Sequence, residues 1–383
     1  MTLDRRFPSV LEWQEGARRR VPKFAYEFLV GGIGEERGIC ANRSALQAVE
    51  LLPHYIGDDF TPELGHSLFG QAFSAPFGVA PFGLDGLIWP RMVQHIAGAA
   101  RRADIPIVMS SFATTTLEEV RALGGENAWF QLYVLKDREK NRSFVERAAR
   151  AGYKTLVLTV DIPTVTRRRR DIRNGLSVPP APNLRTYWEV LKRPAWAIET
   201  LRAGRPEFKT LLDYVPEGLS LAELGAYLAE ETSCIVTIDR IREIRDLWKG
   251  RLIIKGILSE TDAKHSFELG ADGLWISNHG GRQLDAAPTP VSVLPGIRKA
   301  VGREIPIMVD SGVRDGLDVA RMMALGADFV FLGRAFIYAV AAMGEKGADH
   351  AMFVLTEELR MTLGQIGCRR PSDLPAHLVA ASE

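Results

Sequence analysis

A histidine and an arginine lie three positions apart in a glycine-rich segment of this chain. The segment runs from Ser277 to Asp285 with the sequence SNHGGRQLD, and it follows the apolar run Gly273–Ile276. An imidazole can take a proton near neutral pH, and a guanidinium can hold a carboxylate. His279 and Arg282 therefore predict proton abstraction from an anionic substrate. A buried core histidine is the alternative, which the glycines and the nearby arginine disfavour.

Two more charged residues end hydrophobic runs. Lys255 ends the run Arg251–Gly256, where a lysine is seldom structural without a paired anion. Asp310 ends the run Ile305–Asp310, and it is either a helix N-cap or the carboxylate that orients His279.

Two later segments combine glycine with arginine, Asp310–Arg314 and Gly333-Arg334. Glycine lets backbone N–H groups approach a phosphate, and arginine neutralises its charge. These segments predict a phosphorylated cofactor.

The elements that must position these residues are short runs of branched apolar residues separated by segments with helical spacing. The runs are Pro76–Ala80, Ile105–Ser110, Trp129–Val134, Thr155–Asp161, Arg251–Gly256, Gly273–Ser277, Ile305–Asp310 and Phe329–Gly333. Eight such units predict a parallel (β/α)₈ TIM barrel. A doubly wound sheet is the competitor, but the first strand ends in Ala80-Pro81-Phe82-Gly83, which is no dinucleotide fingerprint.

In a barrel, the C-terminal ends of the strands meet on one face, so the polar residues there should converge. They are Ser110, Gln131, Tyr133, Thr159, Asp161, Lys255, Ser277, His279, Arg282, Asp310, Arg314 and Arg334. The serine, threonine and glutamine side chains could contact the edge of a flat polar ring. Tyr133 taken alone is more often a core residue than a catalytic one.

We expect a single domain over residues 1–383. It has an N-terminal helical extension over 1–75, including Lys23–Val30 and Glu36–Ala48, a barrel over 76–346 and a C-terminal helical segment over 347–383. A long insertion, 162–238, follows the fourth strand. Its mixed apolar, aromatic and basic residues suit a lid, a subunit contact or an interfacial membrane segment. Arg167–Arg170 begins it, either as a solvated patch or with one member facing the site.

Composition narrows the partners and the compartment. The net charge of +1 gives no reason to expect nucleic acid. The three cysteines show neither disulfide nor metal-ligand spacing, which fits a reducing compartment. The first 21 residues lack the apolar stretch of a signal peptide, and no segment has the length and apolarity of a membrane-spanning helix.

These residues resemble the FMN-dependent L-2-hydroxy acid oxidase and dehydrogenase family over nearly the whole chain. The resemblance is carried by Pro22-Lys23, Gly31-Gly32, Ala80-Pro81, Ser110-Ser111, Phe130–Tyr133, Thr159–Asp161, Lys255-Gly256, Ser277–Asp285, Asp310–Arg314 and Gly333-Arg334. The Ser277–Asp285 block is the most specific of them. The family implies an FMN-bearing (β/α)₈ barrel that oxidises an (S)-2-hydroxy acid to a 2-oxo acid.

The resemblance also implies roles. His279 would be the catalytic base, and Asp310 would hold and stabilise its imidazolium. Arg282 and Arg168 would clamp the substrate carboxylate, and Tyr133 would bind the substrate oxygen. Lys255 would stabilise negative charge on the reduced flavin. The residues implied to contact FMN are Ala80, Pro81, Ser110, Gln131, Thr159, Lys255, Ser277, Asp310, Gly312, Arg314, Gly333 and Arg334.

The chain departs from the family at Phe28, where the usual residue is a tyrosine that binds the substrate carboxylate. Phe28 predicts a substrate that is bulkier or more apolar than glycolate. Gly83 replaces the alanine usual in oxidases. Three segments, Leu84–Pro90, Arg193–Trp196 and Thr362–Cys368, resemble the mandelate dehydrogenase branch.

That branch implies a cytoplasmic homotetramer, peripheral on the inner face of the membrane, that passes electrons to quinone. An oxygen-using oxidase that forms hydrogen peroxide is the alternative within the same chemistry. An FMN barrel for isomerisation or nicotinamide-linked nucleotide chemistry is disfavoured by the His279–Arg282 pair. An inactive flavin-binding scaffold is disfavoured because His279, Arg282, Lys255 and Asp310 are all present.

Overall fold

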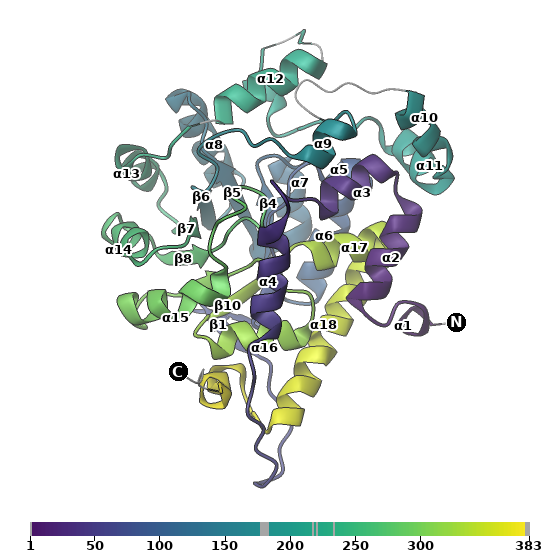
Figure 1. The fold of residues 1–383 in the computed structure, drawn as a ribbon. Coiled ribbons are helices and arrows are strands. Elements are labelled where there is room, and N and C mark those ends of the chain that lie inside the picture. The colour runs from purple at the N-terminus through teal and green to yellow at the C-terminus, as the bar shows by residue number, and fades with distance from the viewer. Residues whose placement is uncertain (1, 177–183, 217, 220, 233, 380–383) are drawn as a thin grey trace.

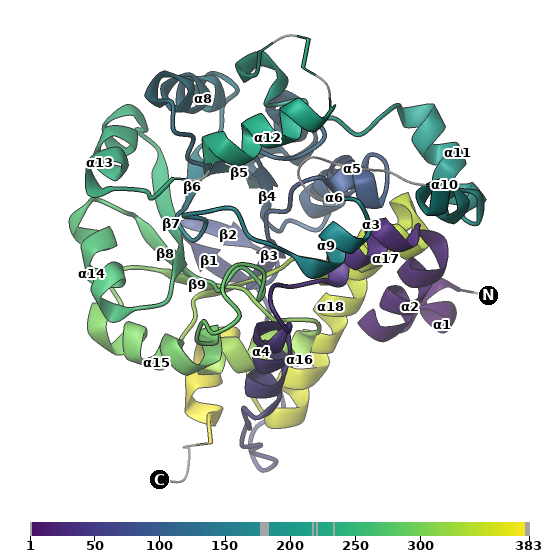
Figure 2. The same cartoon turned by 45° about the horizontal axis from the view of Figure 1, so that its top comes forward.

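Eight parallel strands form a closed barrel in the computed structural model, which describes residues 2–176, 184–216, 218–219, 221–232 and 234–379 (Figure 2). Around the barrel the order is β10-β3-β4-β5-β6-β7-β8-β9. The strands are β3 (Phe77–Val79), β4 (Ile107–Ser110), β5 (Ala128–Tyr133), β6 (Thr155–Thr159), β7 (Arg251–Ile257), β8 (Gly273–Ile276), β9 (Ile307–Val309) and β10 (Phe329–Leu332). The predicted (β/α)₈ fold is confirmed, and each strand lies within or overlaps its predicted run.

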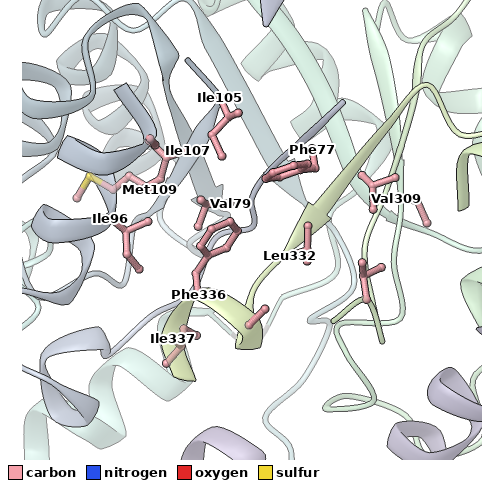
Figure 3. Packing of buried hydrophobic residues seen from close by; sticks show 14 of the residues in the cluster. Phe77, Val79, Ile96, Ile105, Ile107, Met109, Val309, Leu332, Phe336 and Ile337 are labelled. Atoms are coloured by element: carbon pink, nitrogen blue, oxygen red, sulfur yellow. The ribbon is translucent and has the colours of Figure 1, made fainter. Parts of the chain in front are cut away.

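An outer layer of helices covers the barrel. It comprises α6 (Met92–Arg102), α7 (Leu117–Gly124), α8 (Arg138–Arg150), α13 (Ile238–Leu247), α14 (Glu260–Glu268), α15 (Pro290–Val301), α16 (Gly316–Ala324), α17 (Arg334–Met343) and α18 (Glu345–Ile366). Thr116, Asp137 and Ser259 cap three of them by accepting backbone N–H groups in the first turn. Figure 3 shows the core between the layers, where Phe336 of α17 lies beside Val79 of β3.

The N-terminal extension contains α1 (Leu3–Arg6), α2 (Val10–Arg20), α3 (Lys23–Val30) and α4 (Arg37–Gln47). It also contains a hairpin of β1 (His66–Leu68) and β2 (Gln71–Phe73), where we expected only helices. Leu68, Phe69 and Phe73 pack into the same cluster as the inward-facing barrel side chains. The hairpin thus closes the end of the barrel opposite the strand C-termini.

The insertion after β6 forms α9 (Arg169–Arg173), α10 (Leu184–Leu191), α11 (Pro194–Ala203), η2 (Leu212–Tyr214) and α12 (Leu221–Thr232). Trp196 of α11 is its anchor, since its indole Nε1 donates to the carbonyls of Leu87 and Ile88 and its ring meets Phe24 edge-on. Helices α10 and α11 lie at the periphery, next to α2 and α3 (Figure 1).

The remaining described elements are α5 (Asp85–Ile88), η1 (Gly125–Asn127) and η3 (Pro371–His377). A bilayer-spanning helix needs about 20 predominantly apolar residues. Within the described ranges, no helix of this chain is both long and apolar enough to span one.

Candidate active site

Strand register brings the polar strand ends together at the barrel mouth. Ser110 of β4 pairs with Gln131 of β5, and Thr159 of β6 pairs with both Tyr133 of β5 and Lys255 of β7. Polar residues at the end of an otherwise apolar strand can point into the mouth because the core ends there. The predicted convergence of these residues is observed.

His279 is held in a constrained backbone conformation beside a carboxylate. Its φ is +57°, a left-handed value uncommon for residues other than glycine, and its N–H donates to Ser277 Oγ at 3.0 Å. Its Nδ1 lies 2.9 Å from Asp161 Oδ1, and its Nε2 lies 3.5 Å from the Tyr133 hydroxyl. Since a carboxylate accepts the Nδ1 hydrogen, Nε2 carries the free lone pair. This nitrogen can receive a proton.

The prediction that Asp310 holds the imidazole is wrong. Asp310 Oδ2 pairs with Lys255 Nζ at 2.8 Å, and its Oδ1 accepts from the Ser311 hydroxyl. Asp161 is the carboxylate at His279. Burial raises the pKa of Asp161, but the charge and hydrogen bond of His279 outweigh it, so the net pKa is lowered. Asp161 is therefore an anion that can stabilise an imidazolium.

Two arginines face one region without enough protein anions to balance them. Arg282 Nη1 donates to the carbonyls of Phe28 and Gly31, at 2.8 Å each, and its guanidinium lies 5.1 Å from the centre of the Phe28 ring. Arg168 Nε is buried and has no hydrogen-bond partner among the described residues. The carboxylate of Asp171 is near Arg168, with 3.9 Å between Asp171 Oδ2 and Arg168 Nη1.

Burial lowers the pKa of Arg282, and the positive charges of Arg168 and Arg334 lower it further. Such a group of desolvated cations is unfavourable unless an anion joins it. Arg168 and Arg282 can therefore receive a substrate carboxylate.

Tyr133 supplies a neutral hydroxyl next to the base. Burial and the negative charge of Asp161 raise its pKa well above the ordinary value, so it stays protonated and can donate. The Tyr133 ring packs edge-on against the Phe112 ring, with 5.4 Å between the ring centres. Phe112 packs in the same way against Phe208 of the insertion. The base thus lies at the edge of an aromatic cluster.

Several buried polar atoms at the mouth lack partners among the described residues. They include both amide atoms of Gln131 and the hydroxyl of Thr159. Buried polar atoms in native proteins are normally hydrogen-bonded, so these indicate a ligand with matching donors and acceptors. Lys255, which donates to Ser277 Oγ at 2.7 Å, adds a positive charge beside them. The isoalloxazine ring of FMN, with its alternating ring nitrogens and carbonyls, fits this set.

Other predicted ring and phosphate contacts are also at the mouth. Ser110 is 1% exposed, and its Oγ accepts from the N–H of Phe112. The N–H of Ala80, the residue before Pro81, donates to the carbonyl of Leu332. After β9, Ser311 and Gly312 have φ of +77° and +93°, and a Cβ at Gly312 would lie 3.0 Å from the Asn42 carbonyl oxygen. This loop therefore requires glycine at 312.

The two predicted phosphate arginines differ in their hydrogen bonds. Burial and the positive charge of Arg334 lower the pKa of Arg314 to about 10. Arg334, which follows Gly333, donates to the carbonyls of Leu29, Gly31 and Gly280. It therefore ties the Ser277–Asp285 segment to α3 in addition to carrying charge, whereas Arg314 keeps more donors for an anion.

Three residues without a predicted individual role also organise the site. Asn42 of α4 and Asn278 exchange amide hydrogen bonds of 2.8 and 2.7 Å. Asp285 accepts the backbone N–H groups of Glu35 and Gly38 at the start of α4. Asn278 and Asp285 lie in the Ser277–Asp285 block, the most specific part of the sequence resemblance. That block was the signal from which a role for these two residues could have been predicted. Their contacts dock the N-terminal extension onto the loop that carries His279.

Comparison with known proteins identifies the family of this chain. Residues 17–381 match the family described as FMN-dependent dehydrogenase. The L-lactate dehydrogenase of Bartonella quintana is 38% identical over 376 residues, which is 98% of this chain and 98% of that protein. The L-lactate dehydrogenase of Alcaligenes faecalis is 39% identical and covers 93% of this chain and 94% of its own length.

Solved structures give the same result. An (S)-mandelate dehydrogenase described as a monotopic membrane protein is 34% identical, with a TM-score of 0.92 over 97% of this chain and 99% of that chain. A mandelate oxidase is 32% identical, with a TM-score of 0.81 over 97% and 98%. The chain therefore belongs to the FMN-dependent 2-hydroxy acid dehydrogenase family, as its sequence predicts. Family membership implies FMN, for which the mouth has matching groups.

Proposed function

We propose that this chain oxidises an (S)-2-hydroxy acid with an apolar side chain, such as lactate or mandelate, to the 2-oxo acid. The observation that carries the proposal is the His279–Asp161 pair next to Arg168 and Arg282. A base and a carboxylate clamp within one buried region are what this oxidation needs.

The side chains divide the work as follows. Arg168 and Arg282 bind the substrate carboxylate and fix the carbon that bears the hydroxyl. His279 Nε2 takes a proton, Asp161 stabilises the resulting imidazolium, and the Tyr133 hydroxyl donates to the substrate oxygen. FMN, when bound, accepts the two electrons. Lys255, Gln131 and Thr159 would hold its ring, with Ser110, Ser277, Ala80 and Pro81 around it. Gly312, Arg314, Gly333 and Arg334 would hold its phosphate, and Asp310 keeps Lys255 in place.

The preference for an apolar side chain follows from aromatic residues at the site. Phe28 offers no hydroxyl to a carboxylate, and its ring lies under Arg282. Tyr133, Phe112 and Phe208 form a continuous aromatic cluster next to the base. An acid with a methyl or aryl group buries apolar surface there, and glycolate does not.

For the electron acceptor we propose a quinone, reached from the inner face of the membrane, with the chain as a peripheral homotetramer. Large apolar side chains on α10 and α11 are exposed, among them Leu184 at 88%, Leu191 at 71% and Leu201 at 83%. Basic side chains accompany them on the same segment, a composition suited to the membrane interface. The (S)-mandelate dehydrogenase described as a monotopic membrane protein, which matches this chain over its length, supports the membrane contact.

Gly83, at the position where the oxidases of the family usually have alanine, lies against the aromatic cluster. A Cβ there would lie 2.8 Å from Phe112 Cβ, so an alanine would push on the aromatic cluster. Glycine at this position therefore allows the observed packing of Phe112.

A substrate panel tests the proposal. The FMN-loaded enzyme is mixed anaerobically with (S)-lactate, (S)-mandelate and glycolate, and flavin absorbance is followed. We expect bleaching by the first two at lower concentrations than by glycolate, then faster reoxidation by a quinone than by air. Rapid peroxide formation in air would favour the oxidase, and no bleaching by any acid would contradict the proposal.

A further inference from the structure

We propose that Glu36 and Arg170 are positioning residues that hold Arg168 in place for the substrate carboxylate. This inference rests on the proposed function. The contact joins the N-terminal extension to the start of the insertion, two segments that are 134 residues apart in sequence. It explains how an arginine on the insertion can have a fixed position in the site.

Arg168 has little of its own to fix it. It is the N-cap residue of α9, a helix of five residues, and its closest carboxylate, on Asp171, is 3.9 Å away. So short a helix is not stable alone and takes its position from tertiary contacts. The contacts of α9 therefore decide where the Arg168 guanidinium lies.

Those contacts lead to α3 and the turn after it. Arg170 Nε donates to Glu36 Oε1 at 2.6 Å, and its Nη2 donates to Oε2 at 2.5 Å. Asn174, just after α9, donates to Glu27 of α3 at 2.5 Å. A two-bond pairing of arginine with carboxylate fixes orientation as well as distance. With the second tie at Asn174, α9 is held at both ends.

The conformation of Glu36 is unusual in a way that serves this pairing. It occupies the N-cap position of α4, where an acidic side chain normally accepts helix N–H groups. Its side chain makes no such bond, and Asp285 accepts the N–H of Gly38 instead. The φ of Glu36 is +65°, a left-handed value that is strained for a residue with a Cβ. The Glu36 carboxylate is thereby directed to Arg170.

Gly31 connects this pair to the other arm of the clamp. Its carbonyl accepts from Arg282 at 2.8 Å, and a Cβ on Gly31 would lie 3.3 Å from Arg170 Cδ. One short segment, residues 31–36, thus receives Arg282 through its backbone and orients the helix of Arg168 through Glu36. The segment sets the spacing between the two arginines that meet the carboxylate.

The test measures carboxylate binding separately from FMN binding. The variants are Glu36→Gln, Arg170→Gln and the double variant, all as FMN-loaded full-length chains. The matched control is Glu35→Gln, whose side chain pairs with Arg37 on the surface, 64% and 79% exposed. Oxalate, a nonreacting dianion, is titrated against the flavin absorbance, and the FMN dissociation constant is obtained from its fluorescence.

Each single variant should weaken oxalate about tenfold, because a displaced clamp group loses its alignment. The double variant should lose no more than either single variant, since both changes remove the same contact. FMN affinity should stay within about twofold, and charge reversal, Glu36→Arg with Arg170→Glu, should recover part of the oxalate affinity.

Unchanged oxalate affinity, an equal loss in Glu35→Gln, or an equal loss of FMN affinity would overturn the inference. If Glu36→Gln does not fold, Arg170→Gln tests the same contact from the other side. Failure of the proposed function is distinct, because the wild-type enzyme would then be bleached by no acid and would not bind oxalate, and this inference would fall with it.

Discussion

The barrel mouth buries polar and charged side chains, whereas helices α10 and α11 of the insertion expose apolar ones. Lys255 and Gln131 are 4% and 0% exposed, while Trp188 is 57% exposed. Both arrangements are unfavourable in water. At the mouth, buried polar groups lose their hydration, and on the insertion, apolar surface stays in contact with water. The two regions therefore indicate two different surroundings: a polar ring with an anionic acid at the mouth, and an apolar interface at the insertion.

The largest effect should come from the base. His279→Asn removes the proton acceptor from the mouth and should slow flavin reduction about 10³- to 10⁴-fold, while FMN binding is retained. Anaerobic stopped-flow absorbance gives the rate. His265→Asn, an exposed histidine on α14, is the control. A loss below tenfold would mean that His279 is not the base.

The next largest effect should distinguish the roles of the two buried carboxylates at the mouth, Asp161 and Asp310. Asp161→Asn should slow flavin reduction roughly 100-fold, because the imidazolium that forms on His279 loses its counter-charge. Asp310→Asn should slow flavin reduction much less and should change the flavin midpoint potential through Lys255. Stopped-flow flavin reduction and potentiometry are the measurements. If Asp310→Asn were the slower variant and Asp161→Asn changed the potential, Asp310 would be the partner of His279.

The insertion should respond to changes that leave the mouth untouched. Trp188→Ala and Leu201→Ala should each weaken binding to anionic phospholipid vesicles about tenfold, because each removes apolar surface from the interface. Turnover with a soluble acceptor should not change. Phe353→Ala removes an equally exposed ring on α18 and should have no effect on sedimentation with vesicles. Equal loss in all three variants would show nonspecific adsorption.

A smaller effect should follow from restoring a hydroxyl at the clamp. Phe28→Tyr should raise kcat/KM for glycolate relative to mandelate about three- to tenfold, because the added hydroxyl makes the pocket more polar and less favourable to an aryl group, whereas a bond to the carboxylate serves both acids alike. Competition kinetics with the two acids measures the ratio. If the ratio falls or stays the same, Phe28 does not set the preference for apolar acids.

The smallest effect concerns a buried charge outside both regions. Burial raises the pKa of Glu358 from 4.5 to about 7. The folded state then holds a proton more tightly than the unfolded state, so its stability falls as pH rises from about 4.5 to 7. Because Glu358 is only partly buried, Glu358→Gln should gain about 1 kcal/mol at pH 8 and nothing at pH 4.

Urea unfolding at the two pH values measures this difference, with and without FMN. The gain should not depend on FMN, since Glu358 accepts from the N–H of Gly316 and lies near the charges of Asp315, the N-cap residue of α16, and Asp318 in α16. A gain of the same size at both pH values would contradict the assignment.

The barrel could be predicted because its strands are nearly continuous apolar runs, buried on both faces. The hairpin could not, because its two strands have three residues each, and each strand buries only its last residue. Whether α10 and α11 meet solvent, a subunit or a membrane is also open from sequence, since all three favour similar residues.

The carboxylate of His279 was assigned wrongly because both aspartates end barrel strands. Alternate strands contribute side chains to the same layer of a barrel. Asp161 follows β6 and His279 follows β8, whereas Asp310 follows β9 and shares a layer with Lys255 of β7. Strand order alone, which the sequence supplies, would have favoured Asp161. The contacts of residues 27–36 depend on side-chain placement across distant segments, for which the sequence has no local signal.

The most direct test of the central claim is flavin reduction by the two enantiomers of one acid. The FMN-loaded enzyme is mixed anaerobically with (S)-mandelate or (R)-mandelate in a stopped-flow instrument. With His279 Nε2 on one side and Arg168 and Arg282 fixing the carboxylate, only the (S) enantiomer should bleach the flavin. Bleaching by neither enantiomer, or by both at equal rates, would contradict the account.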